Sequence, residues 1–546
     1  MKVTPRSWRV ALGWARHAAL IVSFVFLTLP AAMAREPLPV LAQIGPWPEA
    51  SALIGYQGRL WLVNGVKWKN HNSADIYSYD PGTGDLRYER HLFSQDAGQP
   101  TILDGLLYWP FEDNRFSNGW GQFMVTNGTD WQFRTIPSGQ IFHSHAMSVV
   151  GDRLIAADSA WRAGLDVSDD GGLTWRRIYE NPTPTGRVSR IVDLFALGDR
   201  VIGPFSGPDG RRLMVAEDET VSDLPGWPRD RSLFGAAVFK GWFYGLVGGD
   251  AGTAVWRSDG RRSERVMAPR AGWGAAGLTA GDDGLWAAGS GSDGGALWFS
   301  ADGAKWELKH TLSGGTPREV LIFGGQPYVA GAGDDGRGIL WGPSPGGRAA
   351  LGVAPEDVPS LPAGPGTEVD WAEAGVRLDA VLRDAETYVD HTAPLRDIVF
   401  ELAQAGPPPD FFAGRLASPV PEMTLSLIGG AVQATAVTMA RWMLLWGMSL
   451  TGTGEVPLDL ITESWDAPAN RAEKYFAAPP AAMWAVAAIG QDDGATIAAL
   501  IERLERTEDP LWLRGDAVGA LSAVTGRRFG YDAAAWRKWW SEAASR

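Results

Sequence analysis

Short apolar runs alternate with polar turns over residues 50–345, a pattern typical of successive β-strands. Each unit has an apolar run, a turn with glycine or aspartate, and a second apolar run containing an aromatic residue or isoleucine. The equivalent positions in the second run are Trp61, Tyr108, Ile155, Ile202, Tyr244, Trp286 and Tyr328. Their spacing is 47 residues three times and then 42 residues three times. A period in the forties with short strands predicts a seven-bladed β-propeller over residues 35–345.

The third repeat shows the predicted four-stranded unit most completely. We expect strands at 146–150, 153–157 and 165–167, then a turn at 168–175 and a fourth strand. Because a propeller blade must leave no long bare edge, the segment 38–44 is predicted to add a strand to the seventh blade.

The turn of the third repeat carries the pattern Ser-x-Asp-x-Gly-x-Thr-Trp and resembles the Asp-box, or BNR repeat, of sialidase-like propellers. The matching residues are Ser168, Asp170, Gly172, Thr174 and Trp175, and a shortened version comprises Ser300, Asp302, Gly303 and Trp306. Serine and aspartate side chains accept hydrogen bonds from backbone N–H groups in such a turn, and glycine supplies a positive φ. The resemblance implies a sialidase-like fold, whereas we interpret the box itself as a structural turn.

After residue 370 the apolar positions recur with a period of 3.6 residues, which predicts helices. Residues 346–369 are rich in proline and glycine and are interpreted as a linker. The helices predicted within the domain 370–546 are 371–384, 394–405, 423–446, 481–489, 495–506, 513–524 and 533–542. Its final part, with Ile497, Leu500 and Leu504 followed by Pro510, resembles HEAT-like repeats. That resemblance implies an all-α, HEAT-like helical domain with a partner-binding surface.

Residues 423–448 are apolar enough to fit either a buried helix or a membrane span. Arg441, Gln433 and several threonines interrupt the apolar run. We interpret the segment as buried, because polar residues are costly within a bilayer.

The first 34 residues have the parts of a secretory signal peptide. Basic residues precede an apolar stretch at 18–29, and Ala32-Met33-Ala34 offers a cleavage site after Ala34. An uncleaved anchor helix is the alternative, although the apolar stretch is short for a bilayer span. We therefore expect a periplasmic or secreted protein that does not stay at the membrane after cleavage.

The composition restricts the chemistry. The chain of 546 residues has no cysteine, which excludes disulfides, thiolate metal sites and cysteine nucleophiles. Its net charge is −14, and loss of the basic signal peptide would leave it more acidic still. Such a surface disfavours nucleic acid as a partner. We expect no cofactor and no metal, and the sequence leaves the oligomeric state open.

In a propeller, the loops from strand two to strand three and from strand four to the next blade share one face, here called the loop face, where ligands commonly bind. The candidate ligand-binding residues on it are Lys67, His71, Glu112, Asp113, Arg115, His143, His145, Arg162, Arg187, Arg190, Arg270, Trp273 and Arg318. Arginines there suit a carboxylate or sulfate, which they grip through paired hydrogen bonds. The other interpretation, which we prefer for these arginines, is that they bridge blades by pairing with neighbouring aspartates and backbone carbonyls.

Particular residues suggest two candidate chemistries, a metal site and sialidase activity. His143 and His145 alternate along a strand and so point the same way, as two metal ligands would, but no third ligand is identifiable. Packing is therefore the preferred role for the pair. Sialidases need an arginine triad and a tyrosine nucleophile; here the Arg-Ile-Pro motif is absent, and Tyr244 and Tyr328 hold the repeated apolar position. No catalytic residue is assigned.

These patterns predict a non-catalytic, exported binding or assembly protein that holds a glycan or protein on the loop face and a second partner on the helical domain. The alternative is a carbohydrate-active enzyme, a sialidase-like glycosidase or lyase, at the channel mouth. Two carboxylates about 5–9 Å apart in an arginine-lined pocket would favour that enzyme. A third possibility is that the helical domain is the active part and the propeller presents it.

Overall fold

The computed structural model describes most of the chain after residue 36. The described residues are 37–66, 73–114, 119–139, 141–182, 188–249, 252–270, 272–346, 358–361, 368–389, 393–427, 432–465 and 477–544. They form a β-propeller-like domain over about residues 40–345, followed by a domain built mainly of helices.

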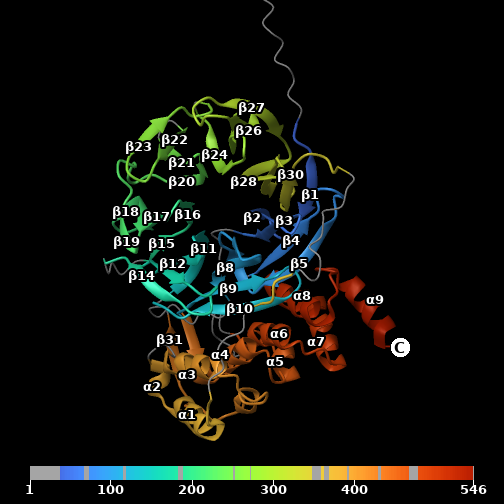
Figure 1. The fold of residues 1–546 in the computed structure, drawn as a ribbon. Coiled ribbons are helices and arrows are strands. Elements are labelled where there is room, and N and C mark those ends of the chain that lie inside the picture. Colours follow the sequence, from blue (N-terminus) through green and yellow to red (C-terminus); the bar gives the residue numbers. More distant parts are fainter. Residues whose placement is uncertain are drawn as a thin grey trace, which may run out of the picture. The chain divides into compact units, whose positions relative to one another are not determined.

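The propeller strands form successive antiparallel units, which Figure 1 shows arranged around a common centre. The N-terminal units are β2 (Glu49–Tyr56), β3 (Arg59–Gly65), β4 (Ala74–Tyr79) and β5 (Leu86–Leu92), then β6 (Ser94–Ala97), β7 (Thr101–Leu103), β8 (Leu106–Asn114), β9 (Gly121–Thr126) and β10 (Trp131–Ile136), then β11 (Ile141–Val150), β12 (Arg153–Ala160), β13 (Gly164–Ser168) and β14 (Arg176–Glu180). The strands predicted in the third repeat are thus confirmed.

The same arrangement continues along the chain. The following units are β15 (Ser189–Ile191), β16 (Phe195–Leu197), β17 (Arg200–Gly207), β18 (Gly210–Glu217) and β19 (Thr220–Asp223), then β20 (Leu233–Phe239), β21 (Trp242–Gly249), β22 (Gly252–Ser258) and β23 (Ser263–Val266), then β24 (Gly274–Ala280), β25 (Leu285–Gly291), β26 (Gly294–Ser300) and β27 (Glu307–Leu312), then β28 (Gly315–Phe323), β29 (Gln326–Gly333) and β30 (Gly338–Trp341).

The N-terminal strand joins the last of these units. β1 (Val40–Ile44) pairs antiparallel with β30, and Ile44 lies opposite Gly338. The prediction that this segment adds a strand at the C-terminal end of the propeller is confirmed. A pairing of Glu49 with Ala332 also links β2 to β29, so the first and last units are hydrogen-bonded to each other.

The repeated apolar position supplies the packing between adjacent sheets. Its residues lie in β3, β8, β12, β17, β21, β25 and β29. Tyr108, 1% exposed, belongs to a core cluster with Met147 and Leu154 of the following unit. Large apolar side chains at a regular spacing, most of them aromatic, thus help to bury one sheet against the next.

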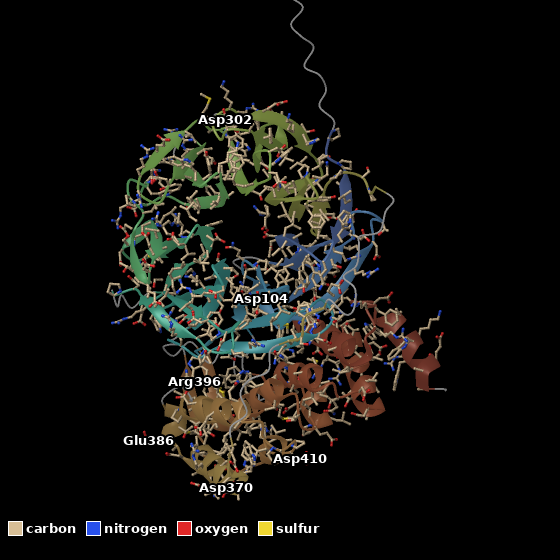
Figure 2. All side chains as sticks on the ribbon, viewed as in Figure 1. Asp104, Asp302, Asp370, Glu386, Arg396 and Asp410 are labelled. Carbon is tan, nitrogen blue, oxygen red and sulfur yellow. The ribbon has the colours of Figure 1, made fainter. Side chains whose placement is uncertain are left out.

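The helices are α1 (Trp371–Arg383), α2 (Glu386–Val389), α3 (Ala393–Gln404), α4 (Ala436–Thr451), α5 (Leu458–Thr462), α6 (Ala478–Ile489), α7 (Gly494–Glu505), α8 (Leu511–Thr525) and α9 (Ala533–Ala544). Local signals start and end several of them. The Asp370 side chain, labelled in Figure 2, accepts hydrogen bonds from the backbone N–H groups of Ala372 and Glu373 at the start of α1. Gly526 ends α8 in the left-handed conformation.

The predicted helix over 423–446 is wrong in its first half. A two-stranded sheet of β31 (Thr424–Leu427) and β32 (Val432–Thr435) precedes α4, so the domain is not all-α. The Thr435 hydroxyl accepts a hydrogen bond from the backbone N–H of Thr438 and starts α4 there. In the sequence, the Gly429-Gly430 pair, which lies outside the described residues, indicates a turn. The apolar residues on both sides of it nevertheless fit a single helical period, which led to the prediction of one helix.

Helix α4 is part of the hydrophobic core. Trp442 and Trp446 are both 0% exposed within it. Within the described part of the chain, we find no helix whose length and apolar character together suffice to cross a membrane. The interpretation of this segment as a buried helix therefore holds for α4.

A single hydrophobic core connects strands of the first two units, between β2 and β10, with the helices, which lie beside those strands in Figure 1. Phe93 stacks on Trp484 of α6 with ring centroids 5.1 Å apart, and Phe133 meets the same indole edge-on at 4.5 Å. Helix α8 lies close to β5, because a Cβ added at Gly519 would stand 2.6 Å from the Cβ of His91. Helices α6 and α8 are therefore packed directly on the propeller strands.

Candidate functional site

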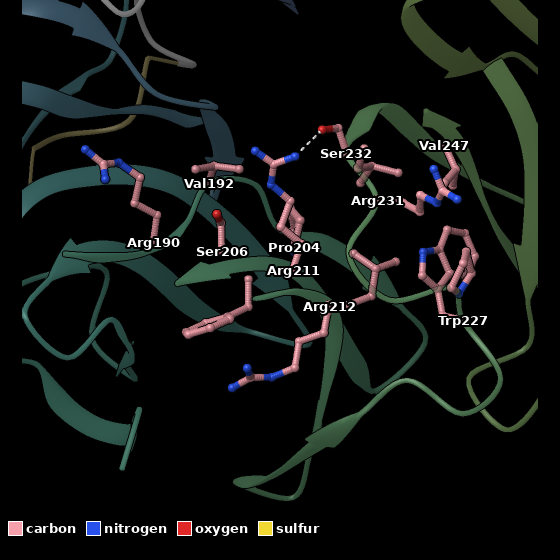
Figure 3. A pocket seen from close by; sticks show the side chains of 14 residues that line it. Arg190, Val192, Pro204, Ser206, Arg211, Arg212, Trp227, Arg231, Ser232 and Val247 are labelled. Atoms are coloured by element: carbon pink, nitrogen blue, oxygen red, sulfur yellow. Dashed lines mark hydrogen bonds between the residues drawn. The ribbon is translucent and has the colours of Figure 1, made fainter. Parts of the chain in front are cut away.

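A pocket of about 370 Å³ lies between the unit of β15–β19 and the unit of β20–β23. Its wall comes from the end of β17, the start of β18, the loop before β20 and the adjoining ends of β20 and β21. The lining residues, drawn in Figure 3, are Arg190, Val192, Pro204, Phe205, Ser206, Arg211, Arg212, Leu213, Trp227, Pro228, Arg231, Ser232, Leu233 and Val247. Because the β17–β18 and β19–β20 connections meet here, the pocket opens at the loop face.

Four arginines and no acidic residue line this pocket. The Nη1 of Arg211 donates to the Ser232 Oγ at 2.8 Å, the dashed line in Figure 3. Arg190 is half-buried, and its guanidinium makes no hydrogen bond or ion pair with another described residue. Each guanidinium carries five N–H donors, so both side chains retain donors for an anion.

Arg212 has a different role from Arg211. Its guanidinium lies 3.8 Å from the Phe205 ring centroid, and its Nε is 3.0 Å from an oxygen of Asp223. Successive residues of a strand point to opposite sides, and Figure 3 shows Arg212 extending away from Arg211. Arg212 therefore forms part of the wall, while Arg190, Arg211 and Arg231 supply the positive charge around the opening.

The base of the pocket is apolar. Leu213, Trp227 and Val247 are 4%, 9% and 3% exposed and belong to one core cluster. The neutral polar side chains in the lining are Ser206 and Ser232. The pocket thus combines a cationic rim with a base that offers few hydrogen-bonding groups.

Arg190 is the predicted ligand-binding residue that lines this pocket. Lys67, His71, Arg115 and Arg187 lie outside the described residues, as does the side chain of Asp113. Three other predicted arginines pair with carboxylates: Arg162 with Glu180 at 3.5 Å, Arg270 with Asp293 at 2.7 Å, and Arg318 with Glu49 at 3.3 Å. The pair of Arg318 in β28 with Glu49 in β2 joins two units, as the bridging interpretation expects, whereas Arg162 and Glu180 both lie within the unit of β11–β14.

The remaining predicted residues lie apart from the pocket. Glu112 is 9% exposed, and Trp273 is 2% exposed within a core cluster of β20–β25. The rings of His143 and His145 are 5.3 Å apart, but the strand register shifts just beside them and breaks strict alternation. Among the described residues, no group of three or more histidine, aspartate or glutamate side chains is placed to hold a metal ion.

The turn after β13 has the hydrogen bonds that its sequence predicts. The Asp170 carboxylate accepts from the Thr174 hydroxyl at 2.6 Å and the Thr174 backbone N–H at 2.9 Å. The Ser168 hydroxyl accepts from the Gly172 N–H at 2.8 Å. Although partial burial raises the pKa of Asp170, these hydrogen bonds outweigh it and lower that pKa. The corresponding Asp302 lies at the periphery of the ring in Figure 2, away from its centre.

Two buried carboxylates share one arginine in the unit of β11–β14. The Nη2 of Arg177 lies 2.7 Å from Asp158 and 2.9 Å from Asp166. Burial raises the pKa of Asp158 to about 7, even though Arg177 opposes the shift. The two aspartates are 2% and 1% exposed, so a substrate cannot reach them. This pair is therefore not the open glycosidase arrangement that the enzyme alternative requires.

A second buried network joins the propeller to α8. The two ring nitrogens of His91 lie 2.9 Å from Asp75 Oδ1 and 3.1 Å from Asp516 Oδ1, and all three side chains are fully buried. The Tyr531 hydroxyl donates to Asp75 at 2.9 Å. Burial alone would lower the pKa of His91, but the hydrogen bonds to Asp516 and Asp75 outweigh it and raise that pKa. The network holds the two domains together rather than presenting a site.

Sequence reasoning missed Arg211, Arg231 and Trp227. A usable signal was present, because the turn Gly207-Pro208-Asp209-Gly210 marks the connection from the second to the third strand of its repeat. Because a connection from the second to the third strand lies on the loop face, the residues directly after that turn belong to that face. Trp227 had no such signal, because it reaches the pocket from a loop without repeat features.

No protein-family model matches this chain, and no curated protein does. Three solved structures have some similarity to this chain. YCF48 bound to D1 peptide has 15% identity and a TM-score of 0.41, and the match covers 57% of this chain and 96% of that chain. YCF48 from Cyanidioschyzon merolae has 13% identity and a TM-score of 0.40, covering 55% of this chain and 98% of that one, and the β-propeller domain of the trilobed protease from Pyrococcus furiosus has 9% identity and a TM-score of 0.39, covering 54% and 96%. At such identities and TM-scores, these similarities carry no argument about function.

Proposed function

We propose that this chain is a non-catalytic binding protein whose propeller holds an anionic group of a glycan or protein ligand in the pocket lined by Arg190, Arg211 and Arg231. The observation that carries the proposal is a lining with four arginines and no carboxylate, in a chain whose net charge is −14. A locally positive concave site on an acidic protein concentrates anions and orients them through paired hydrogen bonds.

The lining also bears on the choice between binding and catalysis. Most glycosidases need two carboxylates facing the substrate, and sialidases use a tyrosine nucleophile instead. The lining of this pocket has neither a carboxylate nor a tyrosine. The pocket therefore supports the binding interpretation rather than the carbohydrate-active enzyme.

The proposal includes a domain organisation. The units from β2 to β30, with β1, are seven blades of a closed propeller; the turn at Ser168–Trp175 is an Asp-box; and α7 and α8 form a HEAT-like pair whose outer surface binds a second partner. The pairing of β1 with β30 supports closure by the N-terminal strand. The hydrogen bonds of Asp170 support a structural role for the turn.

Removal of single arginines tests the function. Arg190→Ala and Arg211→Ala are compared with Arg270→Ala, an exposed arginine outside the pocket that pairs with Asp293. A screen of acidic glycans, sulfated glycans and peptides should give ligands whose affinity falls about tenfold or more in the first two variants, because hydrogen bonds to a charged group are lost. Ligands that bind all three variants equally well would place the binding site elsewhere and end the proposal.

Export is proposed together with this function. Residues 1–36 lie outside the described residues, so the support is the sequence of the segment itself. N-terminal sequencing of the mature protein from fractionated cells should give Arg35 as the first residue, in the periplasm or the medium. Recovery of the chain with an intact N-terminus in the cytoplasm would contradict export.

A further inference from the structure

The chemistry of the pocket restricts the ligand more than its charge alone does. Its base is formed by Leu213, Trp227 and Val247, and its neutral hydroxyl groups belong to Ser206 and Ser232. Ser232 already accepts a hydrogen bond from Arg211. No asparagine, glutamine, aspartate or glutamate lines the pocket, so side-chain acceptors for a polyhydroxylated ligand are scarce there.

A sugar ring buried in this pocket would lose water from several hydroxyl groups and regain few hydrogen bonds. A buried polar group left without a partner is destabilising. A ligand with one anionic end and an apolar body fits better, because the carboxylate meets the arginines while the apolar body lies on the buried base. The volume of about 370 Å³ is near the small end of the range for small-molecule pockets, about 300–1,000 Å³, so it suits the end of a ligand.

We propose that the group bound here is a carboxylate attached directly to an apolar group. Two sources share that chemistry: the last residue of a protein or peptide with a free C-terminus and an apolar side chain, and a free apolar carboxylic acid. Arg190 and Arg211 hold the carboxylate, and the surface formed by Trp227, Leu213 and Val247 holds the apolar group. This inference rests on the proposed function, because it names the ligand class of the same pocket.

The probes separate the anionic end from the apolar body. A fluorescein-labelled peptide, Gly-Ser-Gly-Ser-Leu-Leu with a free C-terminus, is compared by fluorescence anisotropy with the same peptide ending in an amide. Butanoate, pentanoate, hexanoate and 4-phenylbutanoate are tested as competitors at constant ionic strength, and tri-galacturonate serves as a carboxylate on a polar sugar. Arg190→Ala, Arg211→Ala and the control Arg270→Ala are each measured with every probe.

We expect amidation, Arg190→Ala and Arg211→Ala each to weaken peptide binding about tenfold or more, with Arg270→Ala unchanged. Among the free acids, each added methylene should strengthen binding by up to about fourfold. Binding of the peptide, of the free acids or of both supports the inference and identifies the source. Because the length of the free acid varies while the protein stays unchanged, this measurement does not require a variant at the bottom of the pocket, such as Val247→Thr, to fold.

Two results would overturn the inference, and they differ in what they leave standing. If tri-galacturonate binds in an Arg190-dependent manner while the amide and the free-acid peptide bind equally weakly, the ligand is an acidic glycan and the proposed function survives. If the free-acid and amidated peptides bind equally and neither arginine variant affects any probe, the pocket is not the binding site. The inference and the proposed function then fail together.

Discussion

Replacing Asp158 by asparagine should remove a large part of the pH dependence of stability in the unit of β11–β14. Asp158 and Asp166 share the single guanidinium of Arg177, so two buried carboxyl groups compete for one positive charge. The backbone N–H of Gly164 also donates to Asp158, at 2.8 Å. Burial nevertheless dominates and raises the pKa of Asp158 to about 7.

The magnitude follows from the difference between the folded and unfolded chains. The Asp158 carboxyl has a pKa near 3.8 when exposed and about 7 in the fold. At about 1.4 kcal/mol for each pKa unit, its ionisation costs the fold roughly 4 kcal/mol. Because the pKa of Asp158 is higher in the folded chain, the protonated carboxyl favours the fold. Its contribution to the free energy of unfolding is fully present below about pH 4 and is lost as the pH rises through 7.

Urea unfolding of the wild type and of Asp158→Asn at pH 5, 6, 7 and 8, followed by tryptophan fluorescence, measures the effect. The free energy of unfolding of the variant should rise relative to wild type by about 3 kcal/mol between pH 5 and pH 8. Absolute stability is not the test, because asparagine cannot accept both existing hydrogen bonds. Asp302→Asn is the control: hydrogen bonds from the backbone N–H groups of Lys305 and Ala304 lower the pKa of Asp302, so this carboxyl is ionised in both the folded and the unfolded chain between pH 5 and pH 8, and its replacement should leave the pH slope in that range unchanged. Parallel pH profiles for wild type and Asp158→Asn would refute the reasoning.

Three further predictions concern the domain junction and the turn. The His91 imidazole, followed by NMR of histidine-labelled protein, should titrate above its usual range near 6.5, and stability at the junction should fall as the pH rises past that value; titration below 6.5 would contradict the raised pKa. Gly519→Ala should lower the free energy of unfolding by about 1–3 kcal/mol, because its Cβ would meet His91 at 2.6 Å, and an unchanged unfolding curve would show that α8 lies farther from β5. Asp170→Ala should cost roughly 1–2 kcal/mol through the lost acceptor for Thr174 without changing ligand affinity; an affinity change would assign the turn a role in binding.

The propeller strands were predictable because their signal is local and repeated. Each unit places a large apolar residue at an equivalent position, such as Trp61 in β3 or Tyr244 in β21, and the period survives changes in the loops. The prediction of a helix over 423–446 was wrong because the signal there does not distinguish a strand from a helix. A hairpin strand and a buried helix are both apolar, so the run around Thr424 and Val432 could not be divided by hydrophobicity alone.

The pocket was predictable only in part. Arg190 follows from the repeat, because it lies at the start of an inner strand on the loop face. Arg211 and Arg212 are adjacent in the sequence, yet Arg212 faces Phe205 and Asp223 while Arg211 faces the pocket. Which arginine remains available depends on the strand register and on acidic neighbours brought by other loops. The positions of charged residues along the sequence do not show which arginine faces the pocket.

The junction of the two domains was invisible to sequence analysis and constrains how the second partner could bind. Asp516 lies 425 residues from His91 along the chain, and neither residue has a motif around it. Separating α8 from β5 would break the buried hydrogen bond between His91 and Asp516, which costs free energy because both groups lose their partner. The aromatic packing of Phe93 and Phe133 on Trp484 adds to that cost. The helices therefore behave as part of the propeller body, and a partner of the helical domain must use a surface other than the side of α8 that faces β5.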